Sequence, residues 1–455
     1  MRSRGWLAAA LLLSPVGLHG QEPTRCTVVP TPTRIARTTG VQLPSKEYNT
    51  FIGGGLLIKC PTRGITLMAD SAEIYGDEKR NFLIGHVDYD EPRLHLVSDF
   101  LTYYTAEERI LAVGNVSGRL PSGSTLKGPQ VDYRRVAPRV RTRAQTLATG
   151  RPTVMIVQKD SSGKEQPPIE VVANTIYMDG DSLIYGSGRV QITRPEIAAT
   201  SDSAFINTGN ETMQLMRNPI VNGTKSRPFQ LVGERIDLFS KDRKLQRVVS
   251  AAKARATSQD LTLRADTIDL RIAADLLQRA YAWGTSRANA DSPTQKLTAD
   301  SLDVHMPGQR VREVRALHKA FAEGRPDSTI HADTTNWIRG DTIVALFDTL
   351  PPVDTSKGPE IRKLISTVNA QAFYNLAPSD TSLHKPAINY VKGHRITINF
   401  DEQKVANIAV DEKVAGIYIE PSNDTTRTRT NPNGRPGTTR TPARTPRPVP
   451  GIRRP

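Results

Sequence analysis

The chain has 455 residues and a formal net charge of +15; 37% of its residues are hydrophobic and 5% are aromatic. This composition is lean for compact globular packing, whereas an extended repeat protein, in which each unit contacts only its neighbours, tolerates it. Most of the excess positive charge lies at the two ends of the chain, so the body between them is only mildly basic.

Residues 1–20 have the pattern of a secretory signal peptide. Arg2 and Arg4 form a charged start, and the short apolar run Leu7–Leu13 and a cleavage region ending near Gly20 follow. The run is too short to span a bilayer comfortably. We therefore expect cleavage and a periplasmic protein, free or associated with the inner or outer membrane; an uncleaved inner-membrane anchor is the alternative. Export argues against nucleic acid as the partner of this basic chain and favours anionic lipid, phosphorylated glycolipid or cell-wall polymer.

Residues 21–50 show little periodicity and are predicted to form an N-terminal arm. The arm contains Cys26, and the other cysteine of the chain is Cys60. In an oxidising compartment the two can pair and tie the arm to the first strand region. The alternative is two inert thiols.

Residues 51–136 alternate apolar and polar side chains, with turn signals such as Gly76-Asp77 between the runs. Short strands with regularly spaced turns predict an all-β architecture. Residues 137–167 are rich in Arg, Thr, Gly and Pro, break the pattern and are predicted to be a linker.

The alternation resumes over residues 168–350, which we interpret as a second repeat block, and a smaller C-terminal β block follows over 351–420. Residues 421–455 are rich in Thr, Pro and Arg and cannot form a core, which predicts a disordered basic tail. We expect this tail to bind anionic surfaces of the cell envelope.

One nine-residue pattern recurs along the chain at steps of about 30 residues, and a repeat of this kind decides the architecture. The copies are LMADSAEIY at Leu67–Tyr75, LVSDFLTYY at Leu96–Tyr104, LKGPQVDYR at Leu126–Arg134, VVANTIYMD at Val171–Asp179, ATSDSAFIN at Ala199–Asn207, LVGERIDLF at Leu231–Phe239, LRADTIDLR at Leu263–Arg271, LTADSLDVH at Leu297–His305 and IHADTTNWI at Ile330–Ile338. A mostly acidic slot falls at Asp70, Asp99, Asn174, Asp202, Glu234, Asp266, Asp300 and Asp333.

The positions around this slot predict a bend in each strand. An apolar residue stands three before the slot, a small residue one before it, and apolar residues two and four after it. The two sets have opposite parity, so they face the same side only if the strand bends or bulges at the slot. A short polar side chain suits such a corner because it can bond a nearby backbone N–H. Gly85, Gly114, Gly188 and Gly284, between the slots, indicate bulges or close approaches.

The inward apolar positions form a stripe along the chain. It comprises Leu67, Ala69, Ile74, Leu96, Leu101, Tyr103, Ile176, Leu231, Ile236, Leu238, Ile268, Leu270, Leu297, Leu302 and Val304. Periodicity alone fits two interpretations of this stripe, a dry core between two sheets or an open groove for apolar ligands.

No pattern in the sequence predicts catalysis, a cofactor or a metal site. The spacing of the slots differs from the nine-residue period of calcium-binding β-rolls, so corner capping explains the acids better. The chain has no phosphate loop, no Gly-x-Ser-x-Gly elbow and no metalloprotease helix. We therefore expect a non-enzymatic protein without cofactors.

The stretch Leu67–Tyr133 resembles the OstA-like family, the β-jellyroll domains of the lipopolysaccharide-transport proteins LptA and LptC and the N-terminal part of LptD. The resemblance rests on the order ADSAEIY, IGHV, SDFLTYY, AVGNVSG and LKGPQVDY. The individual motifs are short and degenerate, and their alternation over roughly 300 residues is what is specific. This chain departs from the short bridge protein of the family by its greater length, its several repeat blocks and its basic tail.

The resemblance implies an elongated, V-shaped, partly open β-jellyroll. Its hydrophobic groove would shelter the acyl chains of lipopolysaccharide, and the inward stripe residues would line that groove. It also implies end-to-end pairing of edge strands with other Lpt-type jellyroll proteins, so that a bridge crosses the periplasm for outer-membrane assembly. The alternatives are an enzyme that acts on polysaccharide from a β-solenoid and a structural or adhesive scaffold of the envelope.

Overall fold

The computed structural model describes residues 27–29, 37–224, 228–258, 261–326, 330, 332–348, 359–379, 385–401 and 404–421. This part is nearly all β-structure, as the alternating pattern predicted, with two short 3₁₀ turns, η1 (Pro61–Arg63) and η2 (Pro307–Gln309). The predicted signal peptide, and the basic tail beyond Pro421, lie outside the described residues. The chain divides into unit 1, residues 1–121, and unit 2, residues 122–455.

The strands of unit 1 are antiparallel neighbours in chain order from β3 to β7, and β1 and β2 both pair with β3. They are β1 (Thr27–Val29), β2 (Arg37–Gln42), β3 (Tyr48–Cys60), β4 (Ile65–Tyr75), β5 (Arg80–Glu91), β6 (Leu94–Tyr104) and β7 (Arg109–Arg119).

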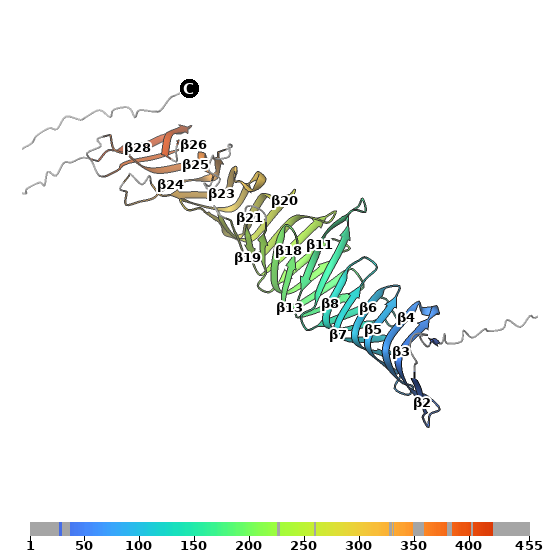
Figure 1. Ribbon diagram of the computed structural model, residues 1–455. Helices are drawn as coiled ribbons and strands as arrows, with labels where there is room; N and C mark the ends of the chain where they lie inside the picture. The colour runs from blue at the N-terminus through green and yellow to red at the C-terminus, as the bar shows by residue number, and fades with distance from the viewer. Residues whose placement is uncertain are drawn as a thin grey trace, which may run out of the picture. The chain divides into compact units, whose positions relative to one another are not determined.

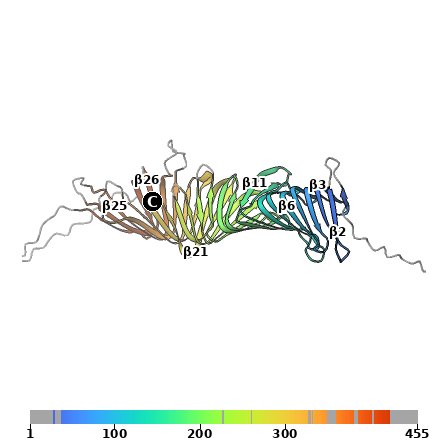
Figure 2. The ribbon, with the colours of Figure 1, turned by 60° about the horizontal axis from the view of Figure 1, so that its bottom comes forward.

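Unit 2 continues the same hairpin pattern over a longer stretch, and Figure 1 shows its strands following one another in chain order. They are β8 (Thr125–Arg134), β9 (Gln145–Thr149), β10 (Thr153–Lys159), β11 (Glu165–Val172), β12 (Thr175–Asp179), β13 (Leu183–Thr193), β14 (Ile197–Asn207), β15 (Thr212–Met216), β16 (Ile220–Gly223), β17 (Gln230–Val232), β18 (Arg235–Lys241), β19 (Lys244–Thr257), β20 (Thr262–Ala273), β21 (Leu276–Asp291), β22 (Gln295–His305), β23 (Glu313–Gly324), β24 (Asn336–Phe347), β25 (Ile361–Leu376), β26 (Ala387–Asp401), β27 (Lys404–Asp411) and β28 (Ala415–Ile419). Strands from β11 to β26 lie side by side in Figure 2.

Each long strand bends at its slot, as the parity of the pattern predicted. In β4, for example, the pairing with β5 shifts register between Met68 and Ser71, on either side of Asp70. Leu67 before the shift and Ala72 after it are 4% and 2% exposed, so both sides of the bend face the interior. An extra residue in the strand switches the inward parity there.

The strand opposite each slot bends through residues with positive φ. Gly85, Gly114 and Gly188 have φ of 76°, 81° and 74°, and the residue after each of them also has positive φ. A Cβ on Gly85 would lie 2.5 Å from Oδ2 of Asp70, so glycine is required both by its φ and by the close approach. Gly284 is the exception, because its φ is not positive and only the closeness of Asp266 excludes a side chain.

The expected linker, residues 137–167, instead contains β9 and β10. Both strands pair with β8, while β9 also pairs with β12 and β10 with β11. Between them Gly150 and Arg151 have φ of 83° and 70°, and Pro152 follows. The Gly and Pro residues that suggested a linker therefore belong to a corner, at which two short strands, β9 and β10, take the place of one long strand beside β8.

The repeat near residue 330 has a different register from the expected one. Asp333 precedes β24, and the register shift of that strand lies between Arg339 and Thr342, at Asp341. The copy is therefore IRGDTIVA, with Gly340 as its small residue. A further copy, VKGHRITI, lies in β26, where the shift places His394 in the slot. Strand β24 pairs directly with β25, so the predicted blocks 168–350 and 351–420 share one sheet.

Candidate functional site

The predicted inward stripe lies in the interior of unit 1 and in the interior of unit 2. All of its residues are buried except Ile74 in unit 1 and Leu297 in unit 2, which are half-buried. Most of the stripe is therefore packed between the two halves of the bent strands. Leu297 lines a cavity in unit 2, and Leu101 lines a space of about 410 Å³ in unit 1.

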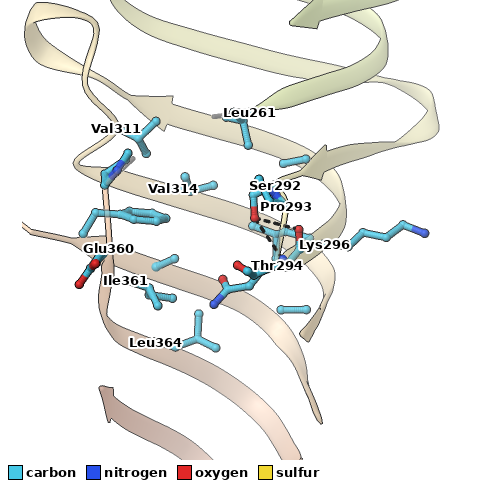
Figure 3. Close-up of a pocket in the computed structure, with 17 residues that line it drawn as sticks. Leu261, Ser292, Pro293, Thr294, Lys296, Val311, Val314, Glu360, Ile361 and Leu364 are labelled. Atoms are coloured by element: carbon cyan, nitrogen blue, oxygen red, sulfur yellow. Dashed lines mark hydrogen bonds between the residues drawn. The ribbon is translucent and has the colours of Figure 1, made fainter. Parts of the chain in front are cut away.

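A cavity of about 270 Å³ lies inside unit 2, between the loop before β20 and strand β25. Apolar side chains dominate its wall: Leu261, Ala290, Leu297, Val311, Val314, Ala322, Ala345, Phe347, Ile361 and Leu364. Figure 3 shows Leu261, from the loop before β20, turned toward the same space as Val314 of β23 and Leu364 of β25. We call this space the apolar cavity.

Small side chains leave the volume of the apolar cavity open. Ala290 of β21, Ala322 of β23 and Ala345 of β24 stand where other parts of the roll carry larger inward residues. Protein interiors are otherwise packed as densely as organic crystals, so a methyl group in place of a branched side chain leaves open volume unless neighbours move in. The bends of β21 to β25 hold the two walls in place around that volume.

The turn Ser292–Gln295 forms one side of the apolar cavity and satisfies its own polar groups. Ser292 N–H donates to the carbonyl oxygen of Gln295 (2.8 Å), and Gln295 N–H donates to Oγ of Ser292 (3.1 Å). The next residue, Lys296, extends away from the apolar side chains in Figure 3 and lies 3.8 Å from Glu323. The turn thus presents few free polar groups to the cavity.

A second space of about 670 Å³ adjoins the first, and we call it the mixed cavity. Thr294, Gln295, Ala322 and Leu364 line both. The mixed cavity adds polar and charged side chains to an apolar wall: Glu323, Arg325, Tyr374, Asn375 and Lys404. Both volumes lie within or near the range of ligand sites in proteins, which are mostly apolar with a few placed polar groups.

The slot residues hold the corners together rather than forming a ligand site. His86 Nδ1 lies 2.7 Å from Asp70 Oδ2, and Lys253 Nζ lies 2.9 Å from Glu234 Oε1. The contact with Glu234 raises the pKa of Lys253. Most slots bond a side chain across the corner, where capping of backbone N–H groups was expected.

Asp266 is the slot whose carboxylate accepts from a backbone N–H in the expected way. Ser286 N–H and Thr285 Oγ1 both donate to Asp266 Oδ2 at 2.9 Å. These bonds, first that from the Ser286 backbone, lower the pKa of Asp266. Within the described ranges, no group of three or more His, Cys, Asp and Glu side chains could hold a metal ion.

Cys60 is disulfide-bonded. Cys26, with which it was predicted to pair, lies outside the described residues, and strand β1 begins at the next residue, with Thr27 opposite Lys59.

The nine-residue pattern did not predict several of the cavity residues. Ala345 is the inward residue four after Asp341, and the wrong register around Asp333 hid it. Leu364 and Tyr374 lie on β25, a bent strand between two copies of the pattern. The alternation of β25 itself, with Ala370, Ala372 and Tyr374 on one face, was the available signal.

Comparison with known proteins gave neither a matching family model nor a significantly similar curated sequence. No helix among the described residues is long and apolar enough to cross a membrane.

Proposed function

We propose that this protein is a non-enzymatic amphiphile carrier of the OstA-like, lipopolysaccharide-transport type. In this proposal it resides in the periplasm, serves outer-membrane assembly, and shelters the acyl chains of lipopolysaccharide or a related glycolipid inside its β-roll. The observation that carries the proposal is the apolar cavity, which lies between the walls of bent strands and adjoins the mixed cavity.

Transfer of an acyl chain into such a cavity is favourable without any chemical step. Each CH₂ group removed from water contributes about 0.8 kcal/mol. The walls offer Leu261, Val314 and Leu364 to a chain, while the polar groups of the turn at Ser292 are already bonded. A carrier of this kind binds and releases its cargo, so the energy for directed transport must come from a partner.

Exposed edge strands support the proposal that the protein pairs with other Lpt-type β-jellyroll proteins to bridge the two membranes. In unit 2, β28 pairs with β26 among the described strands, and Ile417 and Ile419 on it are 61% and 54% exposed. In unit 1, β2 is exposed along its length and pairs with β3. Unpaired apolar edges recruit further strands. The basic residues of the tail 421–455 would add attraction to anionic envelope surfaces.

Photo-crosslinking in cells tests the proposal. A photoreactive amino acid at Leu297, inside the apolar cavity, should label lipopolysaccharide. The matched control is the adjacent Thr298, which follows Leu297 on β22 and lines neither the apolar nor the mixed cavity. Equal labelling at both positions, or labelling at Thr298 alone, would refute the carrier function and favour an envelope scaffold or a polysaccharide-active enzyme.

A further inference from the structure

The apolar and mixed cavities adjoin each other and share four lining residues, and the rest of their walls differ in chemical character. Thr294 and Leu364, both labelled in Figure 3, border the two spaces. On one side of them the wall is mostly apolar, although Glu360 and Lys296 also belong to it. On the other side it carries Arg325, Lys404 and Tyr374. A ligand that extends through both spaces must therefore be amphiphilic.

Tyr374 places a hydroxyl group inside the mixed cavity. Its side chain faces inward from β25 with Ala370 and Ala372, and the residue is 5% exposed. Burial raises the pKa of Tyr374, so the hydroxyl is neutral at physiological pH and available as a donor. The hydroxyl has no hydrogen-bond partner among the described residues, and it is not one of the sealed side-chain atoms left without a partner, so it is accessible from the cavity that Tyr374 lines. A ligand oxygen in the mixed cavity would satisfy it.

The neighbouring Asn375 does not compete for this role, because its own bonds are used within the protein. Its Nδ2 donates to the carbonyl oxygen of Thr334 and to Oδ1 of Asn336, each at 3.0 Å, and the residue is 3% exposed. Asn375 therefore fixes the segment before β24 against β25 and positions Tyr374 beside it.

The charges around Tyr374 favour an anionic group. Arg325 and Lys404 line the mixed cavity, and Arg325 makes no ion pair with any described residue. The acid in the lining, Glu323, lies 3.8 Å from Lys296 and is thereby partly neutralised. Two cations and a neutral hydroxyl donor suit the oxygens of a phosphate ester.

We propose that the joined cavities bind one phosphorylated amphiphile in a defined orientation. The acyl chain occupies the apolar cavity, and the phosphate group lies in the mixed cavity, where Tyr374 donates a hydrogen bond and Arg325 and Lys404 supply charge. This inference rests on the proposed carrier function and adds to it the headgroup chemistry and the direction in which the cargo lies.

The test uses the purified full chain and displacement of an apolar fluorescent dye, N-phenyl-1-naphthylamine. The competitors are a lysophosphatidic acid, the monoacylglycerol with the same acyl chain, and inorganic phosphate. Tyr374→Phe should weaken lysophosphatidic acid binding about tenfold or more, since a hydrogen bond to a charged group is lost. Arg325→Gln should also weaken the binding of lysophosphatidic acid. Neither substitution should change the affinity for the dye or for monoacylglycerol.

Tyr390→Phe is the matched control, because that hydroxyl donates to Gln371 Oε1 on the opposite face of the sheet; it should leave every affinity unchanged. Thermal unfolding checks the fold, and Tyr374→Phe should melt close to the wild type because the hydroxyl that it removes makes no hydrogen bond to a described residue.

Failure of the wild type to bind the dye would refute the carrier function. If the wild type binds the dye and Tyr374→Phe has the same affinity for lysophosphatidic acid as the wild type, the headgroup site is refuted and the carrier function is not. If inorganic phosphate binds as tightly as lysophosphatidic acid, the site binds free phosphate, and the proposal of an amphiphilic ligand is refuted.

Discussion

Two stretches of unit 2 follow the same corner rule and enclose different interiors. The closed stretch, β13 to β18, buries large inward side chains such as Ile192, Ile206 and Leu215. The cavity stretch, β20 to β26, carries alanine at many of the equivalent positions, and the apolar cavity lies within it. Both have bulged strands, a small residue before the slot and a paired corner. The difference shows that the corners set the distance between the walls, while side-chain size decides whether the space between them is filled.

The largest expected effect is the loss of a large side chain from the closed stretch. Leu215 is 0% exposed. Leu215→Ala should lower the free energy of unfolding by about 3–5 kcal/mol, because buried apolar surface is lost and a cavity is left behind. Leu364→Ala should cost about 2 kcal/mol, near the lower limit for such changes, because this side chain already borders open space. Urea denaturation followed by circular dichroism measures both. Equal losses would contradict the comparison.

Adding volume should show the opposite asymmetry. Ala204→Leu in the closed stretch should destabilise the protein by about 1–3 kcal/mol, because the site is 3% exposed and packed on all sides. Ala345→Leu projects into the apolar cavity and should cost less than about 1 kcal/mol while reducing dye binding. Thermal denaturation and dye titration on both variants check this. A strongly destabilised Ala345→Leu protein would mean that the cavity is not open to an added side chain.

The corners differ in backbone chemistry between the two stretches. Gly188→Ala in the closed stretch should cost about 1–2 kcal/mol, since φ is 74° and a Cβ would lie 2.6 Å from Asn174 Nδ2. His318 in the cavity stretch already accepts φ of 63°, and its Nδ1 lies 3.5 Å from Oδ1 of the slot residue Asp341, a contact between exposed groups that contributes little. His318→Gly should therefore change stability little, because relief of strain and the greater freedom of the unfolded chain offset each other. The unfolding midpoints of the two variants decide this, and a costly His318→Gly would show that the contact with Asp341 stabilises the corner.

The smallest expected effect is a pH dependence at the corners. The pKa of Asp266 is lowered in the folded protein, so its carboxylate contributes stability above its unfolded pKa, and this contribution is lost as pH falls through the folded value. Asp266→Asn should slightly lower the unfolding midpoint at pH 7, and the difference from wild type should shrink in acid. Asn174 is a slot residue without an ionisable side chain, so the unfolding midpoint of Asn174→Ala should differ from that of the wild type by the same amount at neutral and acid pH. If the difference in midpoint between Asp266→Asn and the wild type does not change with pH, the role of the ionised carboxylate is refuted.

Much of the fold could be predicted because two parities in one nine-residue pattern require a bend. That argument correctly places the corners at Asp70, Asp266 and Asp300. The prediction was wrong at Asp333, because the sequence His-Ala-Asp matches the motif although β24 starts three residues later. It was also wrong at Gly150-Arg151-Pro152, because these residues form a corner between two strands and have the composition of a linker. Short motifs are ambiguous in this way, because pairing with neighbouring strands selects the register.

The sequence alone determines that this chain is an all-β repeat protein with an inward apolar stripe, since the period of its side chains allows no other regular structure. It does not determine where that stripe encloses open space. The cavity arises because Ala290, Ala322 and Ala345 come from three different strands and meet only after the sheet bends. Tyr374 joins them from a strand that the nine-residue motif does not mark. Packing between distant residues is a property of the folded walls, so only the tertiary structure decides it.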